Sequence, residues 1–213
     1  MNRLQNIGRA YRLWADDHGG HFPASESVTN RGWKELLSSP DQGAKCWVNY
    51  AIMADVLGQS PKLLVCPADE RTPAARFNSK GMDVEPVWTN FMTDNTVSYF
   101  VGVSADESDP RSILGGDRNL GPGTVPAADY GYSPANARGN DVAIPIAGQV
   151  SWSLKMHSAG NTAGAGNILL GDGSVQFVSS ADFRTNWLSR AAPTTNWPPG
   201  HIPSSPSIRL IFP

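Results

Sequence analysis

The stretch NILLGDGSVQFV, from Asn167 to Val178, contains the strongest signal for the fold. Two apolar runs flank the dipeptide Asp172-Gly173. Such a dipeptide favours a type I′ turn, whose two central residues both take positive φ. The pattern therefore predicts an antiparallel β-hairpin with Asp172 and Gly173 at its turn.

Further strands are expected on both sides of this hairpin in the sequence. Apolar residues alternate in Val97–Val103 and Gln149–Leu154, with the period of a β-strand. Ser112–Gly115 follows an acidic turn and is interpreted as a neighbouring strand. Lys62–Cys66 (KLLVC) is a short apolar run stopped by Pro67, which favours a buried strand. Residues 67–96 and 119–146 are rich in turn-forming residues and are expected to form long loops.

The first part of the sequence has helical periodicity. Leu4, Ile7, Tyr11 and Trp14 recur at steps of three and four residues, which predicts an amphipathic helix over residues 2–17. Shorter helices are expected around residues 33–37, 47–57 and 180–188. This order of elements predicts an α+β domain over residues 1–213, in which the N-terminal helix packs on an antiparallel sheet. Residues 191–213 are interpreted as a Pro-rich tail that ends in a strand-like segment.

Composition gives little support to several classes of function. The formal net charge is -2, without a basic run, so binding to nucleic acid has no electrostatic support. The sequence contains neither a signal peptide nor an apolar run of about 18 residues, the length that spans a membrane. Cys46 and Cys66 are too far apart for a zinc motif, which leaves either a disulfide or two buried thiols.

Several segments, spread from end to end, together resemble one protein family. They are LQNIGRAYRLWADDHGGHFP (Leu4–Pro23), SPKLLVCPADERTPA (Ser60–Ala74), VSYFVGVSADESDPRSILGGDRN (Val97–Asn119), MHSAGNTAGAGNILLGDGSVQFVSS (Met156–Ser180) and IRLIFP (Ile208–Pro213). In this order they are similar to the prepilin-type, secretion-pathway-G-like proteins of Verrucomicrobia and Planctomycetes. The resemblance implies a pilin-like fold and a structural pseudopilin subunit of a type II secretion or type IV pilus-like assembly, not an enzyme.

The resemblance also implies a location and partners. Family members begin with a leader, a cleavage site and a long apolar helix, and residues 1–18 resemble the last part of that helix. The implied partners are other pilin-like subunits and the secretion machinery, with no nucleic acid. Membrane contact would occur only through an N-terminal helix absent from this chain, which would anchor the precursor in the inner membrane, with the domain outside the cytoplasm. The stripe of Leu4, Ile7, Tyr11 and Trp14 is interpreted as the assembly face of the helix.

The resemblance raises the possibility of calcium, because major pseudopilins hold this ion in a loop of the sheet region. Asp106, Glu107, Asp109 and Asp117 are the candidate ligands, since carboxylates are hard oxygen donors. Their spacing does not match an EF-hand loop, and a solvated acidic turn explains them equally well. No other cofactor is expected.

Two other functions remain open. A secreted glycan-binding module would use Trp88 and Trp197, which lie in polar segments. A hydrolase would use His157 with an acidic partner such as Asp172. The family often has a His shortly before Asp-Gly, but the spacing is longer here, and the predicted turn already accounts for Asp172. Turn and loop roles are therefore favoured over a catalytic pair.

Overall fold

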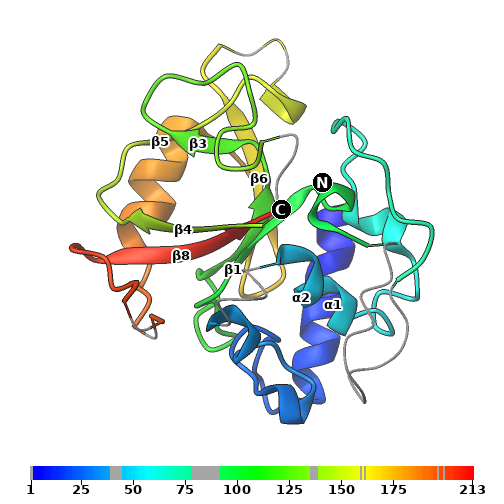
Figure 1. Cartoon of the computed structure of the whole chain (residues 1–213). Coiled ribbons are helices and arrows are strands. Elements are labelled where there is room, and N and C mark those ends of the chain that lie inside the picture. The colour runs from blue at the N-terminus through cyan, green and yellow to red at the C-terminus, as the bar shows by residue number, and fades with distance from the viewer. Residues whose placement is uncertain are drawn as a thin grey trace.

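The computed structural model describes residues 2–38, 45–77, 92–134, 139–158, 160, 162–195, 197–198 and 200–213. It has an α+β fold in which helical segments cover both faces of a six-stranded antiparallel sheet (Figure 1). The strands have the spatial order β4-β8-β1-β2-β6-β7, with β1 at Tyr99–Gly102, β2 at Ile113–Asp117, β4 at Asn140–Pro145, β6 at Ala165–Leu170, β7 at Val175–Ser179 and β8 at Ser207–Phe212. A separate pair joins β3 (Leu120–Pro122) to β5 (Val150–Trp152).

The helical segments are short apart from the first. They are α1 (Asn2–Asp16), η1 (Val28–Asn30), η2 (Leu36–Ser38), α2 (Cys46–Ile52), η3 (Pro61–Leu64), η4 (Asp94–Thr96), η5 (Met156–Ser158), and the consecutive α3 (Ser180–Asp182), η6 (Phe183–Trp187) and η7 (Leu188–Arg190). Helices α1 and α2 pack on one face of the sheet, and the α3–η7 segment packs on the other (Figure 1).

Strand side chains enter two apolar clusters, one on each face. In β1, Tyr99 and Val101 join the cluster under α1, and Phe100 joins the opposite cluster. In β8, Ile211 faces the α1 side and Leu210 the other side. This alternation follows from the two-residue period of a strand. The four inner strands β8, β1, β2 and β6 are therefore buried on both faces, whereas the edge strands β4 and β7 keep exposed residues.

Helix α1 confirms the prediction of an amphipathic helix packed on the sheet. The side chains of its apolar stripe, Leu4, Ile7, Tyr11 and Trp14, are all buried. The helix lies against the β6–β7 hairpin, and its backbone approaches the turn closely at Gly8. A Cβ atom on Gly8 would lie 2.7 Å from the carbonyl oxygen of Gly173. Glycine is required at this crossing because no side-chain atom fits there.

The hairpin at residues 167–178 is confirmed, but its turn is not of type I′. Gly173 has a φ of 81°, whereas Asp172 is not among the residues with positive φ. The Gly173 amide donates to the Leu170 carbonyl, and the Asp172 carboxylate accepts from the Ser174 amide at 2.8 Å. A longer loop with a single left-handed glycine therefore replaces the expected two-residue turn.

Three sequence predictions about strands are wrong in part. Lys62–Cys66 is not a strand, because Pro61 begins the 3-10 helix η3 and Leu64 is buried without joining a sheet. The segment 119–146 contains β3 and β4 and is not one long loop. The strand expected at Gln149–Leu154 exists as β5, but it pairs with β3 outside the main sheet.

The strand-like segment expected at the end of the chain is confirmed as β8, but it is an inner strand of the main sheet and not the end of a tail. β8 lies between β4 and β1 and pairs with β4 from Ser207 to Phe212. Arg209 is buried within it, and its guanidinium donates to both carboxylate oxygens of Asp141 and to the carbonyl of Leu37. The end of the chain therefore completes the core.

Replacing Gly8 with alanine is expected to destabilise the protein despite the better helix propensity of alanine. The propensity gain is about 1 kcal/mol, whereas overpacking against the hairpin costs about 1–3 kcal/mol. We expect a net loss in the free energy of unfolding, measured by urea denaturation. Asn6→Ala on the exposed face of α1 is the matched control and should be neutral or slightly stabilising. Equal gains in both variants would contradict the close approach.

Asp94 should give stability a measurable pH dependence. Its buried carboxylate accepts a hydrogen bond from the Trp47 amide at 3.0 Å, and burial raises the pKa of Asp94 to about 7. The folded state then holds a proton that the unfolded chain releases near pH 4. This contribution to stability is present below pH 4 and is lost as pH rises through about 7.

Urea unfolding at pH 5 and pH 8 tests this expectation, with Asp94→Asn as the comparison. The wild type should lose more unfolding free energy between the two pH values than Asp94→Asn does, because asparagine does not titrate. A difference of the same size in the two proteins would show that Asp94 is not the group responsible.

Candidate functional site

A polar cluster lies where strand β2 ends, at the boundary between the sheet and the loops. Asp117 is the last residue of β2, and Asn167 lies on the neighbouring strand β6. His157 belongs to η5, just before β6, and Cys66 follows η3. Three parts of the sequence, around residues 66, 117 and 157–167, therefore bring an acid, an amide, an imidazole and a thiol together.

Asp117 is at the centre of the hydrogen bonds. Its Oδ2 accepts from the backbone amide of Asn167 at 2.7 Å and from the Asn167 side-chain amide at 2.9 Å. The same oxygen lies 2.8 Å from Nδ1 of His157. The other oxygen, Oδ1, is buried and has no hydrogen-bond partner among the residues that the structure describes. A buried carboxylate with one unpaired oxygen is costly in free energy.

His157 connects this carboxylate to the thiol. Its Nε2 lies 3.6 Å from Sγ of Cys66, which also accepts a hydrogen bond from the Ala68 amide at 3.4 Å. The pKa of His157 is raised to about 10. The hydrogen bond to Asp117 is the largest cause of this rise and the contact with Cys66 is the second, whereas burial acts in the opposite direction. The imidazole therefore retains its proton at neutral pH.

The backbone before His157 takes an uncommon conformation. Met156 has a φ of 53°, in the left-handed region that non-glycine residues rarely adopt. Such strain persists where the surrounding structure holds it in place. Here it places the imidazole between Asp117 and Cys66, with 26% of the side chain exposed. His157 is the side chain through which solvent reaches the cluster.

The segment CPADER, residues 66–71, ties the cluster to the rest of the molecule. Asp69 forms two hydrogen bonds, at 2.7 and 2.9 Å, with the Arg118 guanidinium, which also lies 3.4 Å from the ring centroid of Tyr130. Arg71 donates to the backbone carbonyls of Val97 and Pro213. The polar side chains of this segment are therefore used to fix loops and the C-terminal residue.

The Asp69–Arg118 pair should contribute strongly to stability. Both side chains are almost fully buried, at 0% and 2% exposed. Asp69→Ala would leave a buried guanidinium without its counter-ion, which costs about 3–5 kcal/mol. Glu70→Ala is the matched control, because Glu70 pairs with Lys155 on the surface and such pairs contribute about 0–1 kcal/mol. Similar unfolding free energies for the two variants would rule out this role.

Asp172 has the turn role that the sequence favoured, and it is not the partner of His157. Asp172 forms its hydrogen bonds in the hairpin region, whereas Asp117 holds the imidazole. The sequence favoured loop roles for His157, but the structure gives it fixed contacts with Asp117, Asn167 and Cys66.

The candidate calcium ligands do not converge. Asp106 accepts hydrogen bonds from Ser108, Asp109 accepts from the Arg111 amide, and Glu107 pairs with Arg12 at 3.0 Å. Asp117 is buried in the cluster described above. Within the part of the chain that the structure describes, Cys66, Asp117 and His157 are the group of three whose ligand atoms come together. The sequence left a calcium site open beside a solvated acidic turn, and the local hydrogen bonds of Asp106 and Asp109 fit the turn.

The remaining candidates also have structural roles. Cys46 and Cys66 are both free, so they form no disulfide, and Sγ of Cys46 donates to the carbonyl of Tyr99. The Trp197 indole donates to the carbonyl of Thr194. Trp88 lies outside the described residues. The glycan-binding hypothesis therefore gains no support from these contacts.

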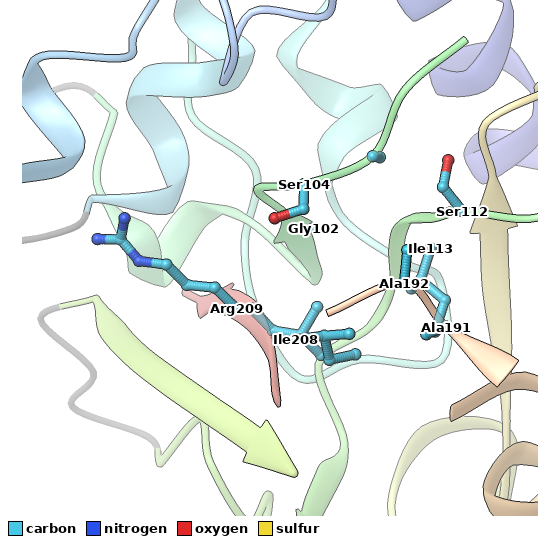
Figure 2. A pocket seen from close by; sticks show the side chains of 10 residues that line it. Gly102, Ser104, Ser112, Ile113, Ala191, Ala192, Ile208 and Arg209 are labelled. Carbon is cyan, nitrogen blue, oxygen red and sulfur yellow. The ribbon is translucent and has the colours of Figure 1, made fainter. Parts of the chain in front are cut away.

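A small, partly open pocket lies between β1, β2 and β8 and the segment that follows η7. Its volume is about 20 Å³, which is enough for a single water molecule. Figure 2 shows Ile113, Ile208, Ala191 and Ala192 around it.

Comparisons with known proteins leave the family open. No family model matches the sequence, and neither a curated protein nor a solved structure shows significant similarity to the chain.

Proposed function

We propose that this chain is the globular part of a pilin-like, pseudopilin subunit in a type II secretion or type IV pilus-like assembly. The observation that carries the proposal is the docking of the 15-residue helix α1 along the β6–β7 edge of an antiparallel sheet. A helix packed on an antiparallel sheet is what the resemblance to pilin-like proteins leads us to expect, and it supports the proposal. Under this proposal the role of the subunit is mechanical, because helix α1 connects the domain to neighbouring pilin-like subunits.

The contacts of α1 suit such a role. Near its start, the Arg3 guanidinium donates to the carbonyls of Lys62 and Val65. In its middle, Gly8 touches the hairpin turn, and farther along, Arg12 forms an ion pair with Glu107. Because the helix is held along its length, a force on it is transmitted to the sheet.

The face of α1 available to a neighbouring subunit differs from the one expected from sequence. Leu4, Ile7, Tyr11 and Trp14 are buried inside this chain, so they cannot also form the contact between subunits. The opposite side carries Leu13, which is 55% exposed. Leu13 lines a shallow groove with Arg9, Arg12, Asp16, Asp172 and Gly173. This surface of α1 and the hairpin turn offers both apolar and charged contacts to the helix of another pilin-like subunit.

Under this proposal the domain lies outside the cytoplasm, and the precursor is anchored in the inner membrane. Among the described residues, no helix has the length and hydropathy needed to cross a membrane. Long surface segments within residues 67–96 and 119–146 would contact cargo or the next subunit.

Fractionation of cells of the source organism tests the proposal. The protein should be found with the inner membrane or with filaments sheared from the surface, and its release from the membrane should require the prepilin peptidase. Leu13→Asp should abolish assembly without unfolding the domain.

Ile202→Asp is the matched control, because Ile202 is 77% exposed and lies in the segment between η7 and β8. It should leave assembly intact. Protein that stays monomeric and unaffected by loss of the peptidase, or Leu13→Asp protein that still assembles, would refute a pilin-like role.

A further inference from the structure

Cys66, Asp117 and His157 each offer an atom that can bind a metal ion, and the proposed pseudopilin function does not require these atoms. The three ligand atoms, one from each side chain, lie within 4.8 Å of one another. Thiolate and imidazole ligands favour ions such as Zn²⁺ and Co²⁺ over Ca²⁺ and Mg²⁺. The chemistry of the cluster therefore differs from that of the acidic calcium site expected from sequence.

The spacing of the thiol and the imidazole matches a shared ion. Zinc bonds of about 2.3 Å to sulfur and 2.0–2.1 Å to nitrogen, at a tetrahedral angle, place the two donors about 3.6 Å apart. The distance between Sγ of Cys66 and Nε2 of His157 is 3.6 Å. Both donors therefore reach one metal position without a large movement of either side chain.

The environment of the imidazole also resembles that of a metal ligand. A histidine that binds metal through one nitrogen commonly has its other nitrogen held by a carboxylate, which fixes the ring. Asp117 Oδ2 provides this contact at Nδ1, and Asn167 in turn holds Asp117.

A second, independent observation is the buried, unpaired Oδ1 of Asp117. A nearby cation would stabilise this oxygen. The neighbouring cations Arg118 and Lys155 are already paired with Asp69 and Glu70.

We propose that Cys66 and His157 bind a thiophilic divalent metal ion such as Zn²⁺, with Asp117 as the carboxylate that orients His157 and balances the charge of the ion. On binding, the Cys66 thiol gives up its proton and Nε2 of His157 provides its lone pair, so protons are released to solvent. One thiolate and one carboxylate neutralise the two positive charges. Water occupies the remaining coordination positions on the side where His157 is exposed.

Co²⁺ is a suitable probe because its thiolate complexes absorb in the near ultraviolet and its visible bands report tetrahedral geometry. The reduced full chain, freed of metal with a chelator, is titrated with Co²⁺ and then with Zn²⁺. We expect a charge-transfer band that saturates at one equivalent and disappears when Zn²⁺ displaces Co²⁺. The band should be absent in Cys66→Ser, and Asp117→Asn should weaken binding about 10–100-fold.

Cys46→Ser is the matched control. Cys46 is the other buried thiol, its hydrogen bond to Tyr99 can be kept by serine, and it lies in α2 outside the cluster. This variant should keep the band.

A measurement on the wild type does not depend on whether the variants fold. Bound Zn²⁺ should slow alkylation of Cys66 but not of Cys46 in mild denaturant, as measured by mass spectrometry. Absence of the thiolate–cobalt band in the wild type would overturn the proposal, because a cluster joined only by hydrogen bonds gives no such band. Loss of the band in Cys46→Ser with persistence in Cys66→Ser would also overturn it.

Discussion

Burial of the four inner strands on both faces is the constraint on which the rest of this structure depends. Apolar side chains alternate between two clusters, so water is excluded from above and below the strands. Charged groups on the strands must then find partners inside the protein, since a buried unpaired charge is costly. Asp117, Arg118 and Arg209 meet this requirement through His157, Asp69 and Asp141. The polar networks are thus a consequence of the layered core.

These networks also explain why the segment CPADER is folded tightly although it has no regular structure. Each of its polar side chains reaches a different part of the chain: Cys66 contacts His157, Asp69 binds Arg118, and Arg71 binds the carbonyl groups of loop residues and Pro213. The segment is close to the beginning of α1 through the contact between Arg3 and Val65. The helix, the cluster and the C-terminus are therefore mechanically connected.

The parts of the fold that the sequence predicted are those determined by local patterns. Helix α1 and the β6–β7 hairpin depend on periodicity within one segment, and both predictions were confirmed. The inner position of β8 between β4 and β1 could not be predicted, because strand order depends on partners far away in sequence. The cluster of Cys66, Asp117 and His157 could not be predicted for the same reason, because His157 is 40 residues from Asp117 and 91 from Cys66 in the sequence. The sequence indicated Asp117 only as a candidate calcium ligand and Asn167 only as part of a predicted hairpin.

The position of β8 between β4 and β1 delays completion of the main sheet during synthesis. Strands β4 and β1 have no common neighbour until β8, which follows every other strand in the chain, has been synthesised. Forming the sheet therefore requires contacts between distant residues, which slows folding. Until β8 is synthesised, β4 has no partner strand in the main sheet and one edge of β1 is unpaired. A chain in this state exposes apolar surface and unpaired strand edges, which makes it prone to aggregation until β8 is in place.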